Sequence, residues 1–239
     1  MQNKPLLTTA IAILFIAMSS RAQIKSTTPA EVQTKESSNS ETKTLGSFKD
    51  SRDGKTYKII KIGTQIWMGE NLAYKAAEGC TAYNNDENNA KIYGYLYTWK
   101  VALSACPTGW HLPSDDEWTI LTSYLGGEDV AGNKLRPITG WMNIELGASN
   151  TNGFRALPGG SSNGGSFYNV GVYGLWWSAT ESGGNAWGRS LYSSESRVYR
   201  TADYKAYGFS VRCIIAKTKN ATLENQKYEL KIKSRLNII

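Results

Sequence analysis

The sequence predicts an α+β domain in which two early helices are followed by an antiparallel sheet with long irregular loops. Helical periodicity occurs only early in the domain, at residues 92–105 and 114–125. Four strand-like segments follow, and the loops between them have hairpin length, so neighbouring strands should run antiparallel. The composition agrees, because 23 Gly beside 8 Trp and 14 Tyr indicate short strands and tight turns rather than long helices.

The first predicted element is a β-hairpin. Residues 57–62 alternate in polarity and are rich in β-branched side chains, Gly63-Thr64 can form the turn, and residues 65–68 return. A polar loop at 75–90 follows. Its centre at 84–89 offers oxygen ligands, but it lacks the glycine and the final glutamate of the twelve-residue calcium loop. We therefore expect a solvated loop there, without a metal.

The first helix is predicted at residues 92–105. Leu96, Trp99, Ala102 and Leu103 recur there at three- and four-residue spacing and define one apolar face.

The second helix is predicted to begin at Ser114. Ser114 and Glu117 have the spacing of a capping box, and Gly126-Gly127 can end the helix. Asp115, Asp116 and Glu117 could suggest a metal cluster or an acid pair. The cap and the helix dipole explain all three carboxylates without that chemistry.

Beyond Gly127 the helical signal fades, and the segment 128–174 is predicted to be a long, turn-rich loop region. The sheet is predicted from the segments 174–180, 186–192, 196–201 and 207–215.

The N-terminal segment 1–22 is typical of a signal peptide. Lys4 precedes an apolar run at 10–18, and Ser20 and Ala22 supply the small residues that a signal peptidase reads. The run is shorter than the roughly 20 residues that a membrane span needs. We expect a secreted protein without a membrane span, located in the periplasm, at the cell surface or in the medium.

Composition divides the rest of the chain into three parts. Residues 23–47 contain almost no large apolar side chains and are predicted to form a disordered spacer. The globular domain is expected at 48–215. A basic C-terminal tail, 216–239, follows, and its apolar residues alternate well enough to add a strand to another protein's sheet.

The chain has three cysteines, Cys80, Cys106 and Cys213. In an oxidising compartment the simplest arrangement is one disulfide and one remaining thiol. None of the three forms a CxxC pair, so their spacing fits no zinc site.

Other function classes find little support in the sequence. The formal net charge is +7, but no nucleic-acid module is present, so no nucleic-acid partner is expected. His111, the only histidine, is predicted to be a buried structural residue. Glu145, Glu181 and Asp203 have no evident structural role, yet no pattern pairs them for catalysis. No nucleophile elbow, phosphate loop or cofactor motif occurs, so we expect no enzyme, cofactor or metal.

The remaining constellation is aromatic. Flat rings with polar edges suit stacking on sugars or protein hot spots, although most should belong to the core. Trp176 and Trp177 should point to opposite faces of their strand. The aromatic residues in or beside the long loop and the late strands are Trp141, Phe167, Tyr168, Tyr173, Trp176, Trp187 and Tyr192. Arg189 could bind an anionic ligand or form a buried ion pair. The predicted ligand-binding residues are Trp141, Tyr168, Asn169, Tyr173, Trp176 and Arg189.

Seven motifs in a fixed order resemble one known family. They are DGKTY at 53–57, IWMGENL at 66–72, YGYLYTW at 93–99, CPTGWHLPSDDEW at 106–118, FRALPGG at 154–160, GLWWSATE at 174–181 and GFSVRCI at 208–214. The chain resembles the Fibrobacter succinogenes major paralogous domain family over residues 48–215. That family is bacterial and exported, and its biochemical role is largely undefined.

A second resemblance is to C-type-lectin-like domains. Residues 102–112 look like the first-helix region of such domains, and the segment with Cys213 looks like their closing strand. The resemblance implies a disulfide between Cys106 and Cys213, which leaves Cys80 unpaired or bonded to another chain. The Glu-Pro-Asn, Gln-Pro-Asp and Trp-Asn-Asp motifs of calcium-dependent sugar binding are absent from the sequence. The paired active-site cysteines of the formylglycine-generating enzymes are not matched either.

The leading functional hypothesis is a secreted or cell-surface recognition module that binds carbohydrate or an extracellular protein. The alternative is a structural or assembly component of the bacterial envelope that acts through its spacer and C-terminal tail.

Overall fold

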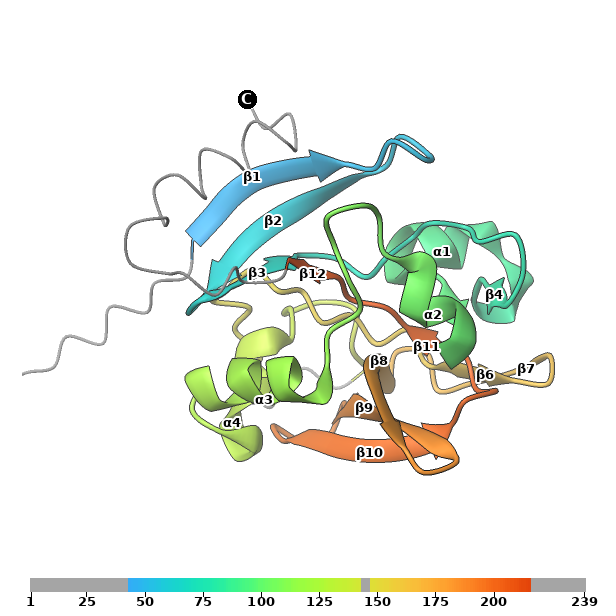
Figure 1. Cartoon of the computed structure of the whole chain (residues 1–239). Helices are drawn as coiled ribbons and strands as arrows, with labels where there is room; N and C mark the ends of the chain where they lie inside the picture. Colours follow the sequence, from blue (N-terminus) through green and yellow to red (C-terminus); the bar gives the residue numbers. More distant parts are fainter. Residues whose placement is uncertain (1–42, 143–146, 216–239) are drawn as a thin grey trace, which may run out of the picture. The chain divides into compact units, whose positions relative to one another are not determined.

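The structure is a computed structural model that describes residues 43–142 and 147–215 (Figure 1). The expected signal peptide at 1–22, most of the spacer at 23–47 and the tail at 216–239 lie outside the described residues. The prediction of an α+β fold is confirmed, because the described residues form four α-helices and three sheets. In the described part of the chain, no helix is long and apolar enough to cross a membrane.

The first sheet has the order β1-β2-β3-β12 and lies at the top of Figure 1. Its strands are β1 (Lys43–Lys49), β2 (Thr56–Ile62), β3 (Gln65–Met68) and β12 (Ile214–Ile215). The β2–β3 hairpin confirms the sequence prediction. β12 pairs antiparallel with β3, so the first and last strands of the domain share one sheet. β1 begins before the expected domain boundary at residue 48, because pairing with β2 orders residues 43–47 of the predicted spacer.

The second sheet has the order β10-β9-β8-β11-β5-β4. Its strands are β4 (Cys80–Thr81), β5 (Leu96–Tyr97), β8 (Tyr173–Ser182), β9 (Asn185–Tyr192), β10 (Val198–Tyr204) and β11 (Phe209–Ser210). β8, β9 and β10 confirm three predicted strands. The fourth prediction, a strand over 207–215, is wrong, because this segment divides between β11 in this sheet and β12 in the other. The sheet is also not wholly antiparallel, since β11 runs parallel to β8.

The segment 128–174, predicted to be one long loop, contains regular structure. Helix α4 (Glu128–Leu135) starts directly after Gly127, and its buried residues Ala131 and Leu135 face the core. The short strands β6 (Ser161–Asn163) and β7 (Ser166–Tyr168) pair as a hairpin. These elements are hard to predict from the sequence, because each is short, glycines lie beside them at 126–127, 159–160 and 164–165, and they depend on tertiary contacts.

The predicted helix at 92–105 is also interrupted. α1 (Glu87–Tyr93) ends at Gly94, where φ is 78°, and α2 (Trp99–Ala105) begins after β5. Pairing of β5 with β4 and β11 outweighs the helical periodicity of residues 94–98. The polar hexad at 84–89 is not a simple loop, since Asp86 caps α1 by accepting a hydrogen bond from the Asn88 amide at 2.9 Å.

Helix α3 (Asp115–Tyr124) confirms the predicted capping box. The Ser114 hydroxyl accepts a hydrogen bond from the Glu117 amide at 3.2 Å, and the Glu117 carboxylate accepts one from the Ser114 amide at 2.8 Å. Gly126 and Gly127, both with positive φ, follow the end of the helix as expected.

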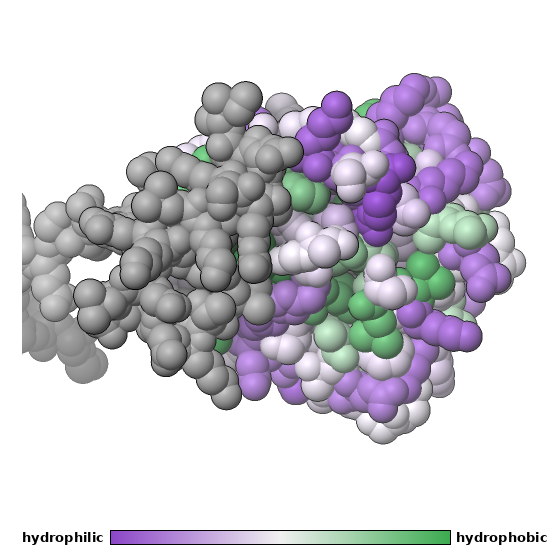
Figure 2. All heavy atoms as spheres, turned by 45° about the horizontal axis from the view of Figure 1, so that its top comes forward, coloured by the Kyte–Doolittle hydropathy of each residue, from purple (hydrophilic) through white to green (hydrophobic). Residues whose placement is uncertain are grey.

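Two hydrophobic clusters occupy opposite faces of the second sheet. Trp176 belongs to a cluster with residues of α3 and α4, whereas Trp177 belongs to a cluster with residues of α2, and residues of the first sheet contribute to both clusters. The two indoles therefore point to opposite faces, as predicted, and both are buried. On the face shown in Figure 2, hydrophilic residues surround a smaller hydrophobic area near the middle of the described part.

A disulfide joins Cys106, at the end of α2, to Cys213, which precedes β12. This pairing confirms what the lectin-like resemblance implied. Closing a loop with a sequence separation of 107 residues stabilises a fold by about 4–5 kcal/mol on the loop-entropy model. Cys80 is the free cysteine of the described residues, and its half-buried thiol donates to the Ala76 carbonyl at 3.4 Å.

The buried side chains of Asn71 and Arg212 connect distant segments. Arg212 Nη2 donates to Asn71 Oδ1 at 2.5 Å, and Arg212 Nη1 donates to the carbonyls of Met68 and Phe154. Burial lowers the pKa of Arg212 to about 9, against the opposing effect of the Glu70 carboxylate, so the guanidinium stays charged at neutral pH.

Asn71 makes further bonds from both ends of its amide. Its Oδ1 also accepts from Trp176 Nε1 at 2.9 Å, and its Nδ2 donates to the Tyr93 carbonyl at 2.8 Å. The pair thus links the loop after β3, α1, β8 and the closing segment before β12.

Asn71→Ala should lower the free energy of unfolding by about 3–5 kcal/mol, because several buried polar groups lose their partner at a cost of about 1–3 kcal/mol each. Urea unfolding followed by tryptophan fluorescence measures this change. The exposed Asn88 provides a control, and Asn88→Ala should have a much smaller effect. Equal stability of the two variants would contradict the role of Asn71.

Candidate functional site

A hollow of about 340 Å³ lies on the Trp177 face of the second sheet. Residues of β8, β9, β10 and β11 line it, and the β6–β7 hairpin with the residue after it completes the wall. The lining residues are Ser161, Ser162, Asn163, Tyr168, Asn169, Tyr173, Leu175, Tyr192, Asp203, Tyr207 and Phe209. This volume is at the lower end of the range for small-molecule sites, about 300–1,000 Å³. We call it the tyrosine pocket.

The β6–β7 hairpin is held against the sheet through Gly208. The Ser162 amide donates to the Gly208 carbonyl at 3.0 Å, and the Gly208 amide donates to the Ser162 carbonyl at 2.8 Å. A Cβ at position 208 would collide with the Ser162 hydroxyl, so a larger residue there would force this hydroxyl to move. At the start of the hairpin, the Gly160 amide donates to the Tyr173 carbonyl at 2.8 Å. These bonds fix one wall of the tyrosine pocket.

Ring contacts fix the aromatic floor. Phe209 stacks on buried Trp177, with ring centroids 4.3 Å apart, and Tyr207 lies 6.2 Å from Phe209. Tyr173 and Tyr192 face one another across β8 and β9 at 4.8 Å. The rings of Tyr173, Tyr192 and Tyr207 are therefore held in place before any ligand arrives.

The polar part of the lining comes from side chains of different strands. Asp203 on β10 is the one charged residue among the described lining residues. Its Oδ2 atom is buried and has no hydrogen-bond partner in the described structure. Asn163, Ser161 and Asn169 add neutral donors and acceptors. Asn169 adopts a φ of 61°, a left-handed conformation that asparagine tolerates, and its carbonyl accepts from the Tyr173 amide at 2.9 Å.

The sequence-predicted ligand residues fall into two groups. Tyr168, Asn169 and Tyr173 line the tyrosine pocket together, and Tyr168 is 47% exposed. Trp141 and Trp176 lie in the hydrophobic core, where Trp141 Nε1 donates to the Ala156 carbonyl at 3.0 Å. Both indoles thus have interior partners and do not line the pocket.

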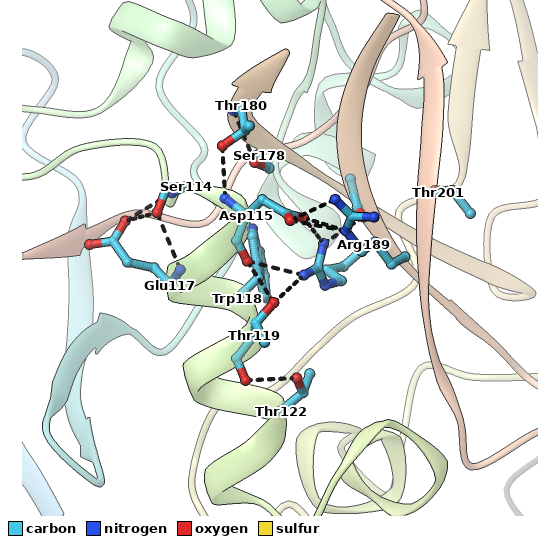
Figure 3. Close-up of polar contacts among 12 residues, drawn as sticks. Ser114, Asp115, Glu117, Trp118, Thr119, Thr122, Ser178, Thr180, Arg189 and Thr201 are labelled. Carbon is cyan, nitrogen blue, oxygen red and sulfur yellow. Dashed lines mark hydrogen bonds and ion pairs between the residues drawn. The ribbon is translucent and has the colours of Figure 1, made fainter. Parts of the chain in front are cut away.

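Arg189, the sixth predicted residue, is buried in an ion pair (Figure 3). Its Nη1 donates to Asp115 Oδ1 at 2.6 Å, and its Nη2 donates to Thr119 Oγ1 at 3.0 Å. Arg200 binds the same carboxylate at 2.9 Å and lies over the Trp187 ring at 3.3 Å. This arrangement is the buried pair that the sequence left open as one possibility, and it anchors β9 and β10 to the start of α3.

Sequence reasoning did not single out Tyr192, Tyr207, Phe209 and Asp203 as ligand residues. Strand alternation carries part of the signal, because Tyr173 and Tyr192 pair directly on one face. The contribution of Tyr207 and Phe209 depends on β11 inserting between β8 and β5, which is a non-local event. Of the other carboxylates considered, Glu181 pairs with Lys205 at 2.6 Å, and Glu145 lies outside the described residues.

The prediction that His111 is buried is wrong, because its side chain is 38% exposed. Its Nε2 lies 3.0 Å from both carboxylate oxygens of Glu117. Burial acts to raise the pKa of Glu117, but hydrogen bonds from His111 and the Ser114 amide outweigh it and hold this pKa below its usual value. The histidine therefore supports the capping box. Among the described residues, no group of three or more His, Cys, Asp or Glu side chains is placed to hold a metal ion.

These features define an α+β domain closed by a disulfide, with an aromatic pocket on one sheet face. A family model described as the Fibrobacter succinogenes major domain matches residues 60–215. The chain belongs to this family, as its ordered motifs predicted. No curated protein and no solved structure matches the chain.

Asp115→Ala should lower the free energy of unfolding by about 3 kcal/mol at pH 7, because Arg189 would stay buried without its carboxylate. Burial acts to raise the pKa of Asp115, but hydrogen bonds from Arg200 and Arg189 hold it below the ordinary 3.8. The stabilisation is therefore present above pH 3.8 and is lost as the pH falls through the lowered pKa.

Urea unfolding of both proteins across this pH range tests the assignment. The difference in stability should shrink at the acid end. Asp116→Ala, at the exposed neighbouring position, serves as the control. A difference that did not depend on pH would contradict an ion-pair origin.

Proposed function

We propose that the protein is a non-enzymatic recognition domain that acts outside the cytoplasm and binds carbohydrate in the tyrosine pocket. The observation that carries this proposal is the lining itself, which combines pre-positioned tyrosine rings with hydrogen-bonding side chains. Sugar rings present apolar C–H faces and polar hydroxyl edges, and such a lining complements both. The disulfide supports an oxidising compartment, which fits the signal peptide expected at 1–22.

We further propose that the domain has a C-type-lectin-like fold. Two features support this assignment. The first and last strands of the domain lie in one sheet. A disulfide also joins the end of an early helix to the closing segment, as in the domains that the sequence resembles.

An extracellular protein partner would use the same exposed rings. The proposal favours carbohydrate, because the tyrosine pocket is concave and small, whereas protein interfaces are usually broad. The alternative role in envelope assembly would depend on the spacer and the tail. Most of the spacer and all of the tail at 216–239 lie outside the described residues, so no described contact favours that role.

Tyr168→Ala should weaken carbohydrate binding by about tenfold, the loss expected for one exposed aromatic contact of moderate strength. The side chain is 47% exposed, so its removal should leave the fold intact. A glycan array identifies the sugar, and calorimetry with that sugar measures the change.

Tyr124→Ala is the matched control, because Tyr124 is 43% exposed on α3 and does not line the pocket. Its affinity should equal that of the wild type. Binding should also persist in EDTA, since the described lining has a single carboxylate. Folded protein that bound no glycan would contradict the proposal.

A further inference from the structure

Asp203 lines the tyrosine pocket, and one of its carboxylate oxygens has no hydrogen-bond donor among the described residues. It lies opposite Ala186 in the β9–β10 pairing. Side chains alternate along a strand, so Asp203 shares its sheet face with Tyr192 rather than with Arg189. Its Oδ2 atom is buried and has no hydrogen-bond partner among the described residues. A buried carboxylate oxygen without a donor is costly, so a donor supplied by a ligand would be favourable.

The nearest basic residues along β10 and beyond its end are committed to other partners. Arg200 pairs with Asp115 at 2.9 Å. Lys205 pairs with Glu181 at 2.6 Å and lies 4.7 Å from the centroid of the Trp99 ring. No lysine, arginine or histidine occurs among the described lining residues. Asp203 therefore has no ion-pair partner among the described residues, so its carboxyl group is available to a ligand.

The aromatic part of the lining favours the same kind of ligand. Ring faces carry a negative quadrupole and attract cations, and the lining offers several tyrosines together with Phe209. A neutral sugar would satisfy the rings and the amide groups, but it would leave the carboxylate without a charged partner. A protonated amine on the sugar would give Asp203 a charge-assisted hydrogen bond, which is stronger than a neutral one.

We propose that the tyrosine pocket selects carbohydrates that carry a free, protonated amine, with the ammonium group bound at Asp203. The ligand class is an amino sugar that is not N-acetylated. This inference rests on the proposed carbohydrate-binding function and adds to it the chemical group that the pocket selects.

The test compares a chitotetraose that is fully deacetylated with the fully N-acetylated form, by calorimetry at pH 6 with the full-length protein. The wild type should bind the free-amine form about tenfold more tightly, because only this form offers a charged donor. Asp203→Asn should abolish this preference and leave affinity for the acetylated form within about twofold, because the isosteric amide keeps the shape of the site. Asp116→Asn, at an exposed position on α3, should keep the preference.

Each other outcome overturns the inference in a recognisable way. Equal affinity of the wild type for both sugars, or a preference that survives Asp203→Asn, would refute selection of the amine while sugar binding stands. Failure of folded protein to bind either sugar, together with a negative glycan array, would refute the proposed function as well. Tighter binding of a tetralysine peptide than of the free-amine sugar would place the ammonium group on a protein partner instead.

Discussion

The fold depends on a buried cation that is solvated by neutral oxygens. Arg212 is fully buried, and the acceptors of its guanidinium are three main-chain carbonyls together with the Asn71 side chain, not a carboxylate. Desolvating a charge is expensive, so these oxygens must be held in place when the chain folds. Asn71 holds them together, because its amide also bonds Trp176 and the end of α1. These hydrogen bonds join the loop after β3, the 154–155 segment and β8.

This constraint also positions the tyrosine pocket. Arg212 and Cys213 follow β11 directly. The hydrogen bonds of Arg212 and the disulfide of Cys213 therefore fix where β11 leaves the second sheet. β11 carries Phe209, which stacks on Trp177 and forms part of the pocket floor. Gly208, beside it, binds the β6–β7 hairpin that forms the wall. A rigid aromatic site of this kind loses little entropy on binding, which favours recognition of a small ligand.

Local signals predicted local structure well. The capping box of α3 and the β2–β3 hairpin follow from residues that contact one another within a few positions of the chain. The broken helix at 92–105 shows the limit, since β5 forms there because of partners far away in the sequence. The prediction of the disulfide rested on a resemblance to known domains, because the spacing of the three cysteines alone left their pairing open. Three lining residues of the tyrosine pocket, Tyr168, Asn169 and Tyr173, could be predicted from the sequence as candidate ligand residues. The sequence could not show that Trp141 and Trp176 are buried, because an indole ring suits a core and a binding surface equally well.

The assignment of the tyrosine pocket as the binding surface of this domain calls for a measurement that locates the ligand. An NMR titration of backbone amides with the free-amine chitotetraose tests it most directly, because it reports the location of binding as well as its strength. Saturable shifts should be concentrated in the β6–β7 hairpin and around Asp203 and Tyr207, with α3 and α4 unaffected. Saturable shifts confined to α3, α4 or the first sheet would show that the ligand binds elsewhere and that the tyrosine pocket is not the binding surface.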